Sequence, residues 1–260
     1  MQIASNHSGH DDWDQHWDRF AAAASANPAQ RMRHRIIARL IRQSESSHLR
    51  ICDIGSGQGD LVAGLVPQIA HAEFVGMELS ASGVEISRKK SPTARFHVCD
   101  LFQQKPEEFG MRDWATHAVC SEVLEHVDDP VAFLKAAAGF VAPGGQMIVT
   151  VPGGPMSAFD EHIGHRQHFT RRSIEATLQA AGFTTERVYL SGFPFFNVYR
   201  LVVIARGKKL VADVDSESSA ASSRVAKAAM AIFDRLFQLN LRNCRFGWQV
   251  VAVARKPAAG

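Results

Sequence analysis

From residue 49 onward, short apolar runs rich in β-branched residues alternate with longer segments whose apolar residues recur every three or four positions. The short runs predict buried strands, and the longer segments predict helices that connect them. This alternation indicates an α/β domain built on a largely parallel sheet. We expect strands at 50–54, 73–77, 94–98, 116–121, 146–151, 184–190 and 248–254, and connecting helices at 60–69, 82–89, 130–140 and 171–182.

A helix is predicted ahead of this core, because Asn27 and Pro28 suit a helix N-cap and first helical position. It runs to about Gln43, and the arginines at every fourth position from 31 to 39 predict a solvated face. At the start of the connecting helix predicted at 82–89, Ser82 and Glu85 have the spacing of a capping box.

The gap before the last strand is long and predicts an insert. It contains an apolar run at 195–204, a Ser/Asp/Glu-rich stretch at 212–223 and an apolar stripe at 225–237. Stripes of this kind predict helices, and the polar stretch predicts a flexible linker. We divide the chain into a helical lead-in and cap (1–45), a core (46–192), a helical insert with a linker near 212–223 (193–246), and a final strand and tail (247–260).

Composition limits the classes of partner and the cellular compartments expected for this protein. Lys and Arg number 29 against 26 for Asp and Glu, a balance that does not call for a nucleic-acid partner. The 4 cysteines have no CxxC spacing, and the polar amino terminus does not have the pattern of a secretion signal. No apolar run approaches the roughly 18 residues of a membrane span. We expect a reduced, cytoplasmic protein.

Candidate chemistry begins at the first strand, which ends in Asp53-Ile-Gly-Ser-Gly-Gln-Gly59 directly ahead of a helix. Alternating glycines let the backbone turn sharply and approach a ligand where a Cβ would collide. The helix start adds free N–H groups suited to a carboxylate or phosphate. Asp53 is placed to accept a hydrogen bond from an ammonium group or an ordered water.

Acidic residues follow the next two strands at the same edge of the sheet. Glu78 comes after the second strand, where a carboxylate can accept from both hydroxyls of a ribose. Asp100 ends the third strand, where it can accept from an adenine amino group while Leu101 flanks the ring. Each acid taken singly could simply cap a turn, so the prediction depends on their occurrence together and in order.

Two further motifs complete a resemblance. The run Ser-Glu-Val-Leu-Glu-His-Val occupies 121–127, and Ala-Pro-Gly-Gly occupies 142–145. With these motifs the chain resembles the class I S-adenosylmethionine-dependent methyltransferases of the small-molecule type. The resemblance implies a doubly wound, seven-stranded Rossmann-like sheet whose last strand is antiparallel, with S-adenosyl-L-methionine as cofactor and S-adenosyl-L-homocysteine as product. It implies that the cofactor is bound by Asp53, Gly55, Ser56, Gly57, Gly59, Glu78, Leu79, Asp100, Leu101, Ser121 and Glu122.

The methyl acceptor is less readable. The stretch Gly-His-Arg-Gln-His-Phe-Thr at 164–170 resembles a motif of relatives concerned with lipid or polysaccharide tailoring, which implies a small-molecule acceptor of lipid- or saccharide-linked type. A hydroxyl acceptor needs a base, and His126 and His165 are the candidates, with Glu125 and His168 beside them. His165 and His168 could instead brace the loop and cap the next helix. By resemblance, the acceptor pocket is roofed by Trp13, Trp17 and Phe20 together with the insert.

Several alternatives stay open. Glu122, Glu125, His126 and a later histidine resemble the metal site of small-RNA 3′-terminal ribose methyltransferases, which would make the chain a divalent-metal-dependent ribose- or catechol-type O-methyltransferase; we assign no metal ligand. A non-catalytic cofactor-binding module would carry the same motifs. An NAD-dependent oxidoreductase requires Gly-x-Gly-x-x-Gly, whereas the third glycine here comes one place early, at Gly59. The apolar stripes of the insert could form core, a dimer interface or a membrane-surface face.

Overall fold

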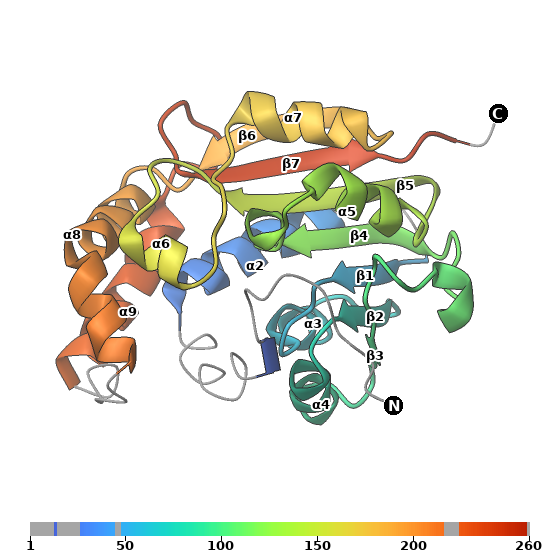
Figure 1. The fold of residues 1–260 in the computed structure, drawn as a ribbon, viewed down its shortest axis with the longest axis horizontal. Helices are drawn as coiled ribbons and strands as arrows, with labels where there is room; N and C mark the ends of the chain where they lie inside the picture. Colours follow the sequence, from blue (N-terminus) through green and yellow to red (C-terminus); the bar gives the residue numbers. More distant parts are fainter. Residues whose placement is uncertain (1–12, 15–26, 45–47, 216–223, 259–260) are drawn as a thin grey trace, which may run out of the picture.

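The computed structural model describes residues 13–14, 27–44, 48–215 and 224–258. Within these residues a seven-stranded sheet has the order β3-β2-β1-β4-β5-β7-β6 (Figure 1). The strand order reverses between β1 and β4, as in a doubly wound sheet, so the predicted fold class is confirmed. The strands are β1 (Arg50–Ile54), β2 (Glu73–Glu78), β3 (Arg95–Val98), β4 (Ala115–Ser121), β5 (Val141–Pro152), β6 (Thr184–Ser191) and β7 (Gln249–Arg255).

Strand direction places the candidate site. β1 pairs in parallel with β2 and β4, whereas β7 is antiparallel to both β5 and β6, so the predicted antiparallel last strand is confirmed. The register sets Ile54 opposite Met77 on one side and Cys120 on the other. The carboxyl ends of these strands therefore meet at one edge, and the residues that follow them lie close together.

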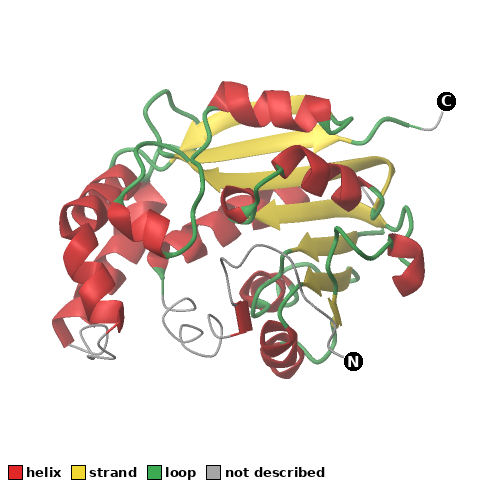
Figure 2. Cartoon of the chain, viewed as in Figure 1, coloured by secondary structure: helices red, strands yellow, loops and turns green. Residues whose placement is uncertain are grey.

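Helices cover both faces of the sheet (Figure 2). Along β1, Cys52 and Ile54 belong to one buried cluster and Ile51 to the other, because successive strand side chains point to opposite faces. Side chains of α5 and α7 fill the first cluster, and those of α2, α3 and α4 fill the second. The helices are α2 (Pro28–Arg42), α3 (Asp60–Leu65), α4 (Ala81–Lys90), α5 (Pro130–Ala138), α6 (Ala158–His162), α7 (Arg171–Ala180), α8 (Phe195–Asp215) and α9 (Arg224–Leu236), with the 3₁₀ turns η1 (Pro106–Phe109), η2 (Leu124–His126) and η4 (Phe237–Leu239).

Local predictions failed at two places. The N-cap of α4 is Ser80, whose hydroxyl accepts from the Gly83 N–H, so the capping box expected at Ser82 and Glu85 is wrong. The Glu85 carboxylate instead pairs with Lys89 one turn later. β5 begins at Val141 rather than at the predicted residue 146, because the Pro-Gly-Gly turn is absorbed into an irregularity of the pairing with β4.

The insert packs against α2. Phe196 of α8 and Phe237 of η4 form a buried cluster with Ala29 and Met32, and the cluster continues through half-buried aromatic side chains. Asp234 of α9 forms ion pairs with the arginines at 31 and 35, whose side chains are 42% exposed, so the predicted arginine face of α2 is solvated and also contacts the insert. α8 extends to Asp215, into the stretch predicted as a linker, and residues 216–223 lie outside the described residues.

Candidate active site

The glycine loop after β1 folds back across the end of β2. Gly55, Gly57 and Gly59 have φ values of +73°, +53° and +77°, a region that side chains with a Cβ rarely adopt. The N–H groups of Gly55 and Ser56 donate to the Met77 carbonyl at 2.8 and 3.1 Å. A Cβ on Gly59 would lie 2.8 Å from the Ser87 side chain. The loop therefore needs its glycines for both conformation and close packing.

Glu78 lies directly against this loop at the end of β2. Its carboxylate accepts from the N–H of Gly57 at 2.7 Å and from that of Ser80 at 2.9 Å. Burial raises the pKa of Glu78, while these backbone donors oppose the rise. A carboxylate has about four acceptor positions, so these donors leave acceptor capacity for a hydroxyl group. Glu78 is thus held in a fixed orientation, as recognition of a ribose requires.

Asp53 is the other buried acid of this loop. Burial, together with the charge of Glu78, raises the pKa of Asp53 to about 7. An acid in this state is stabilised in its charged form by a nearby cation, and the ammonium of a bound amino acid is such a group. Asp53 therefore fits the amino-acid end of the cofactor that the sequence predicts.

The end of β3 adds the residues predicted to bind adenine. The Cys99 N–H donates to the Glu78 carbonyl at 2.7 Å, which places Asp100 beside Glu78. Leu101 is buried, whereas Leu79 and Phe102 expose 53% and 57% of their surface. Exposed apolar side chains next to acidic groups suit the faces of a planar ring. Its exposure adds Phe102 to the candidate residues, although nothing in the sequence distinguishes it from a core residue.

The described part of the lead-in crosses this edge. The Asp14 carboxylate accepts from the Ser80 hydroxyl at 2.5 Å and from the Ser82 N–H at 3.1 Å. The Trp13 ring meets the His126 ring edge-on, with centroids 4.9 Å apart. The segment therefore spans from the cofactor side of the edge to the histidines. Trp17 and Phe20, also predicted to roof the pocket, lie outside the described residues.

Glu122 is held in a strained conformation between these two regions. It follows Ser121, whose hydroxyl lies 2.8 Å from that of Thr150, and its φ is +57°. Its carboxylate accepts from Gln249 of β7 at 2.9 Å and pairs with Arg33 of α2 at 3.4 Å. Neither partner could be found in the sequence, because both lie far from Glu122 along the chain.

A row of imidazoles continues from Trp13. The His126 and His165 rings meet edge-on at 4.8 Å, and His165 Nδ1 lies 3.2 Å from His168 Nε2. Burial, aided by the charge of His126, lowers the pKa of His165 to about 3. Burial also lowers the pKa of His168. Both imidazoles are therefore neutral at pH 7, and the ring distances show that the structure brings the predicted candidates together.

Two acids border these histidines in contrasting ways. Asp160 of α6 is fully buried, and Arg200 of α8 donates to both of its oxygens at 2.8 Å. Burial raises the pKa of Asp160, but Arg200 and Ser157 outweigh it and lower that pKa to about 2. The Glu125 carboxylate is also fully buried, yet it accepts no hydrogen bond from another described residue. Burial and the charge of Glu122 raise the pKa of Glu125 well above its usual range.

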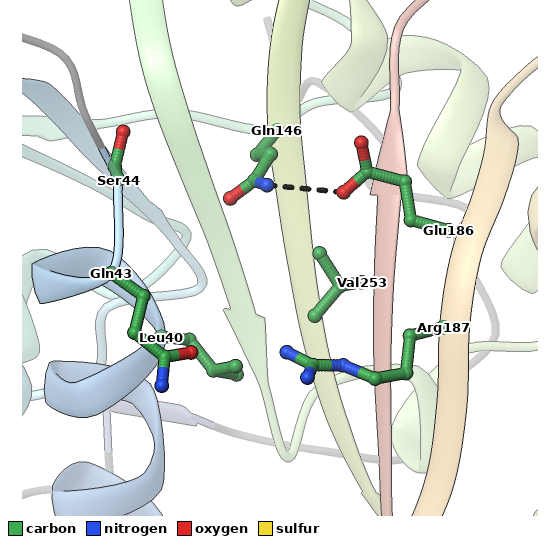
Figure 3. Close-up of a pocket in the computed structure, with 7 residues that line it drawn as sticks. All are labelled: Leu40, Gln43, Ser44, Gln146, Glu186, Arg187 and Val253. Atoms are coloured by element: carbon green, nitrogen blue, oxygen red, sulfur yellow. Dashed lines mark hydrogen bonds between the residues drawn. The ribbon is translucent and has the colours of Figure 1, made fainter.

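A separate pocket lies at the opposite edge. It has a volume of about 370 Å³ and lies between α2 and the strands β5, β6 and β7 (Figure 3). Figure 3 shows Gln146 donating to Glu186 at its rim, a bond of 3.1 Å. In the β5–β7 pairing, Gln146 lies opposite Arg255, the last residue of β7. Gln249, which contacts Glu122 in the candidate active site, is the first residue of β7 and so lies at the other end of the strand. This pocket is therefore remote from the candidate active site.

Comparison with known proteins agrees with this geometry. Residues 28–188 match the family described as "Methyltransferase domain". The chain is similar to the ubiquinone biosynthesis O-methyltransferases of Aromatoleum aromaticum, at 34% identity over 38% of this chain, and of Xylella fastidiosa strain 9a5c, at 29% identity over 53% of it. These matches cover only 42% and 55% of the relatives' own length.

Solved structures share the fold at low sequence identity. The crystal structure of the [4+2]-cyclase SpnF has a TM-score of 0.62 at 15% identity and covers 95% of this chain and 96% of its own. Phosphoethanolamine N-methyltransferase 2 of Haemonchus contortus, in complex with S-adenosyl-L-methionine, has a TM-score of 0.57 at 17% identity and covers 96% of this chain and 61% of its own. At these identities the likeness establishes the fold alone, and a fold can carry different reactions.

Proposed function

Since this chain belongs to the class I S-adenosylmethionine-dependent methyltransferases, we propose that it transfers a methyl group to a small-molecule acceptor at the carboxyl edge of its sheet. The observation that carries this proposal is the position of Glu78, fixed by two backbone N–H groups between the glycine loop and Asp100. The family match sets aside the nicotinamide-dependent alternative.

Different residues along this edge would bind different parts of the cofactor. Glu78 would hold the ribose, Asp100 and Leu101 with Leu79 the adenine, and Asp53 with the glycine loop the amino-acid end. Ser121 and Glu122 would form the floor nearest the acceptor. When bound, S-adenosylmethionine supplies a methyl group on an activated sulfonium. The chain's main task is then to orient the acceptor atom and exclude water, and orientation of this kind can provide most of the acceleration.

A hydroxyl acceptor must also lose a proton. His165 and His126 meet edge-on beside this edge, and burial keeps the His165 imidazole neutral. The Asp160 carboxylate, 3.9 Å from His165 Nδ1, would stabilise the positive charge that the ring gains on accepting a proton. A positioned base contributes roughly 10²- to 10⁴-fold in rate. We propose His165 as this base, with Asp160 and His168 holding its loop against α8.

Cofactor binding is tested by calorimetric titration of the full chain with S-adenosylmethionine. Glu78→Gln removes a charged acceptor, a loss of about 1.5–3 kcal/mol, and should raise Kd by roughly 10- to 150-fold. Glu85→Gln is the matched control, because Glu85 is exposed and bonds only Lys89 among the described contacts. Equal affinities of the two variants would refute the assignment of the ribose site.

The acceptor is identified by incubating the protein with cell extract and isotopically labelled cofactor, then searching for metabolites that gain the labelled methyl group. Conversion of the cofactor to S-adenosylhomocysteine that depends on extract supports an enzyme. Cofactor that stays bound and unchanged in extract would instead indicate a non-catalytic cofactor-binding module.

The insert supports a lipid-linked acceptor. At the start of α8, Val198 and Leu201 are exposed, and in the neighbouring loop Leu241 and Phe246 expose 52% and 66% of their surface. Asn197 joins the two segments by donating to the Phe246 carbonyl at 2.6 Å. The loop residues 239–248 include two arginines and no acid. An apolar and basic surface of this kind suits an anionic membrane surface.

This surface adjoins the candidate site. Trp248, at the end of the loop, packs closely against Gly154, because a Cβ added to Gly154 would lie only 2.7 Å from the Trp248 ring. The Gly154 carbonyl in turn lies 3.1 Å from His168 Nδ1. No helix among the described residues is long and apolar enough to cross a bilayer. Co-sedimentation with anionic vesicles, lost with neutral vesicles or with Phe246→Asp, is the expected result. Equal sedimentation with both vesicle types would refute it.

The four cysteines of this protein are free thiols. Free thiols are typical of proteins in a reducing compartment, which supports a location such as the cytoplasm.

A further inference from the structure

We propose that Glu125, His126 and His165 bind a divalent transition-metal ion beside the acceptor position. The proposal deepens the proposed function, because its role depends on methyl transfer, but the binding itself can be tested without the cofactor. It rests on three observations: an unpaired buried carboxylate, two converging imidazoles, and neighbouring acids that are already occupied.

The carboxylate is the first observation. Glu125 lies in η2, directly after β4, and is 0% exposed. Neither of its oxygens accepts a hydrogen bond from another described residue. A buried carboxylate without a partner is costly, and such groups in folded proteins are paired or coordinate metals. Arg33 is not a sufficient partner, since its guanidinium is bound to Glu122.

The imidazoles converge on the same point. One ligand atom from each of Glu125, His126 and His165 lies within 4.8 Å of the other two. Ligands about 2.0–2.2 Å from an ion lie roughly 3–4 Å apart, so small side-chain rotations bring these atoms to bonding distance. Two imidazole nitrogens and one carboxylate oxygen favour Zn²⁺, Co²⁺ or Mn²⁺ over Ca²⁺ or Mg²⁺.

The hydrogen bonds of the neighbouring acids favour this group of ligands over two other possible groups. Asp160, His165 and His168 also lie within 4.8 Å of one another, but Arg200 and Ser157 already saturate the Asp160 carboxylate. Glu122, included in the metal set that the sequence suggests, is bound to Arg33 and Gln249. Glu125 is the acid in this cluster whose oxygens are left for an ion.

Three protein ligands leave coordination positions open for an oxygen of the acceptor. With an ion bound, His165 holds the metal, and the ion takes over from the free imidazole the task of activating the acceptor hydroxyl. A metal ion in that position would orient a hydroxyl and lower its pKa, which relates the site to hydroxyl acceptors in particular.

The test uses the full chain after chelator treatment, titrated with Co²⁺ in the absence of cofactor and followed by calorimetry and by visible absorption. We expect one saturable site with the absorption of nitrogen- and oxygen-bound cobalt, displaced by Zn²⁺. Loss of groups that merely support a metal ligand costs about 10- to 100-fold in affinity, so Glu125→Gln and His165→Ala should each weaken binding by more than roughly 100-fold. His162→Ala, an exposed histidine of the same segment, should leave binding unchanged.

Circular dichroism and cofactor titration separate the possible failures. A Glu125→Gln protein that is folded, binds S-adenosylmethionine and binds Co²⁺ as well as the parent overturns the metal site while leaving the proposed function intact. So does a parent protein that binds cofactor but shows no saturable Co²⁺ binding. If Glu125→Gln does not fold, His165→Ala provides the same comparison.

Discussion

The ion pair between Asp160 and Arg200 connects the histidine segment to the insert, and its removal tests that connection. Asp160 is fully buried, and only 11% of the Arg200 side chain is exposed, so solvent screens the pair little. Arg200→Met removes both hydrogen bonds and leaves a buried carboxylate whose other partner is Ser157. We expect this substitution to destabilise the protein strongly at neutral pH.

The magnitude follows from the pKa of Asp160, which is lowered from 3.8 to about 2. A carboxyl group whose pKa is lower in the folded protein than in the unfolded protein stabilises the fold at any pH above its unfolded-state pKa. This stabilisation is lost as pH falls through the folded-state pKa, so it is fully present at pH 7.5. Nearly two pKa units correspond to about 2.5 kcal/mol, and breaking a buried pair typically costs about 3–5 kcal/mol. Taking about 3 kcal/mol, Tm should fall by roughly 6–12 °C.

Thermal unfolding followed by circular dichroism at pH 7.5 measures this effect. Arg200→Met combined with Asp160→Asn should recover part of the loss, because no charge is then left buried. Arg166→Met is the matched control: Arg166 pairs with the exposed Asp128, and exposed pairs contribute about 0–1 kcal/mol. A Tm change below about 2 °C for Arg200→Met, or no recovery in the double variant, would refute the reasoning.

Three further predictions follow from single positions. Gly59→Ala should destabilise the protein by about 2 kcal/mol or more and weaken cofactor binding, as measured by denaturant unfolding and calorimetry, because φ is +77° and the new Cβ would meet Ser87; a variant as stable as the parent contradicts this. His165→Ala should lower kcat by about 10²- to 10⁴-fold while leaving the Kd for S-adenosylmethionine within about twofold, and an unchanged kcat excludes it as the base. Burial lowers the pKa of His117 to about 4, so its unfolded form binds more protons below 6.5 and stability falls as pH falls. Relative to the parent, His117→Gln should therefore gain about 2 kcal/mol in unfolding free energy between pH 7 and pH 5, and parallel pH profiles would contradict this.

The sequence predicts the parts of this fold that depend on neighbouring residues. Strand β1 and helix α2 lie where their apolar patterns place them, since each pattern reports which side chains are buried. The cap of α4 was misplaced, because Ser80 and Ser82 are both suitable residues and only the path of the chain after Glu78 decides between them. Predictions therefore held where the local sequence is sufficient and failed where competing local choices are decided by tertiary contacts.

The cofactor side and the acceptor side of the site differ in the same way. Gly57 and Glu78 are recognisable because the order of strands in a doubly wound sheet fixes where such residues meet. Asp14, Arg33 and Arg200 carry no pattern of their own, and they reach the site only because the lead-in, α2 and the insert pack around the same edge. The proposed acceptor side is therefore assembled from the lead-in, α2 and the insert rather than from the strand ends that carry the cofactor residues.

Glu122 shows why this assembly has a functional meaning. A non-glycine residue at φ +57° stores backbone strain, and such strain persists only where the surroundings over-determine the conformation. Here they do, because the Glu122 N–H donates to the Thr150 carbonyl at 2.8 Å while Gln249 and Arg33 hold its carboxylate. Three segments distant in sequence thus converge on the Glu122 residue. Arg33 and Gln249 are thus engaged by Glu122, whereas the nearby Glu125 carboxylate accepts no hydrogen bond from another described residue. The proposed cation site depends on this difference between the two acids.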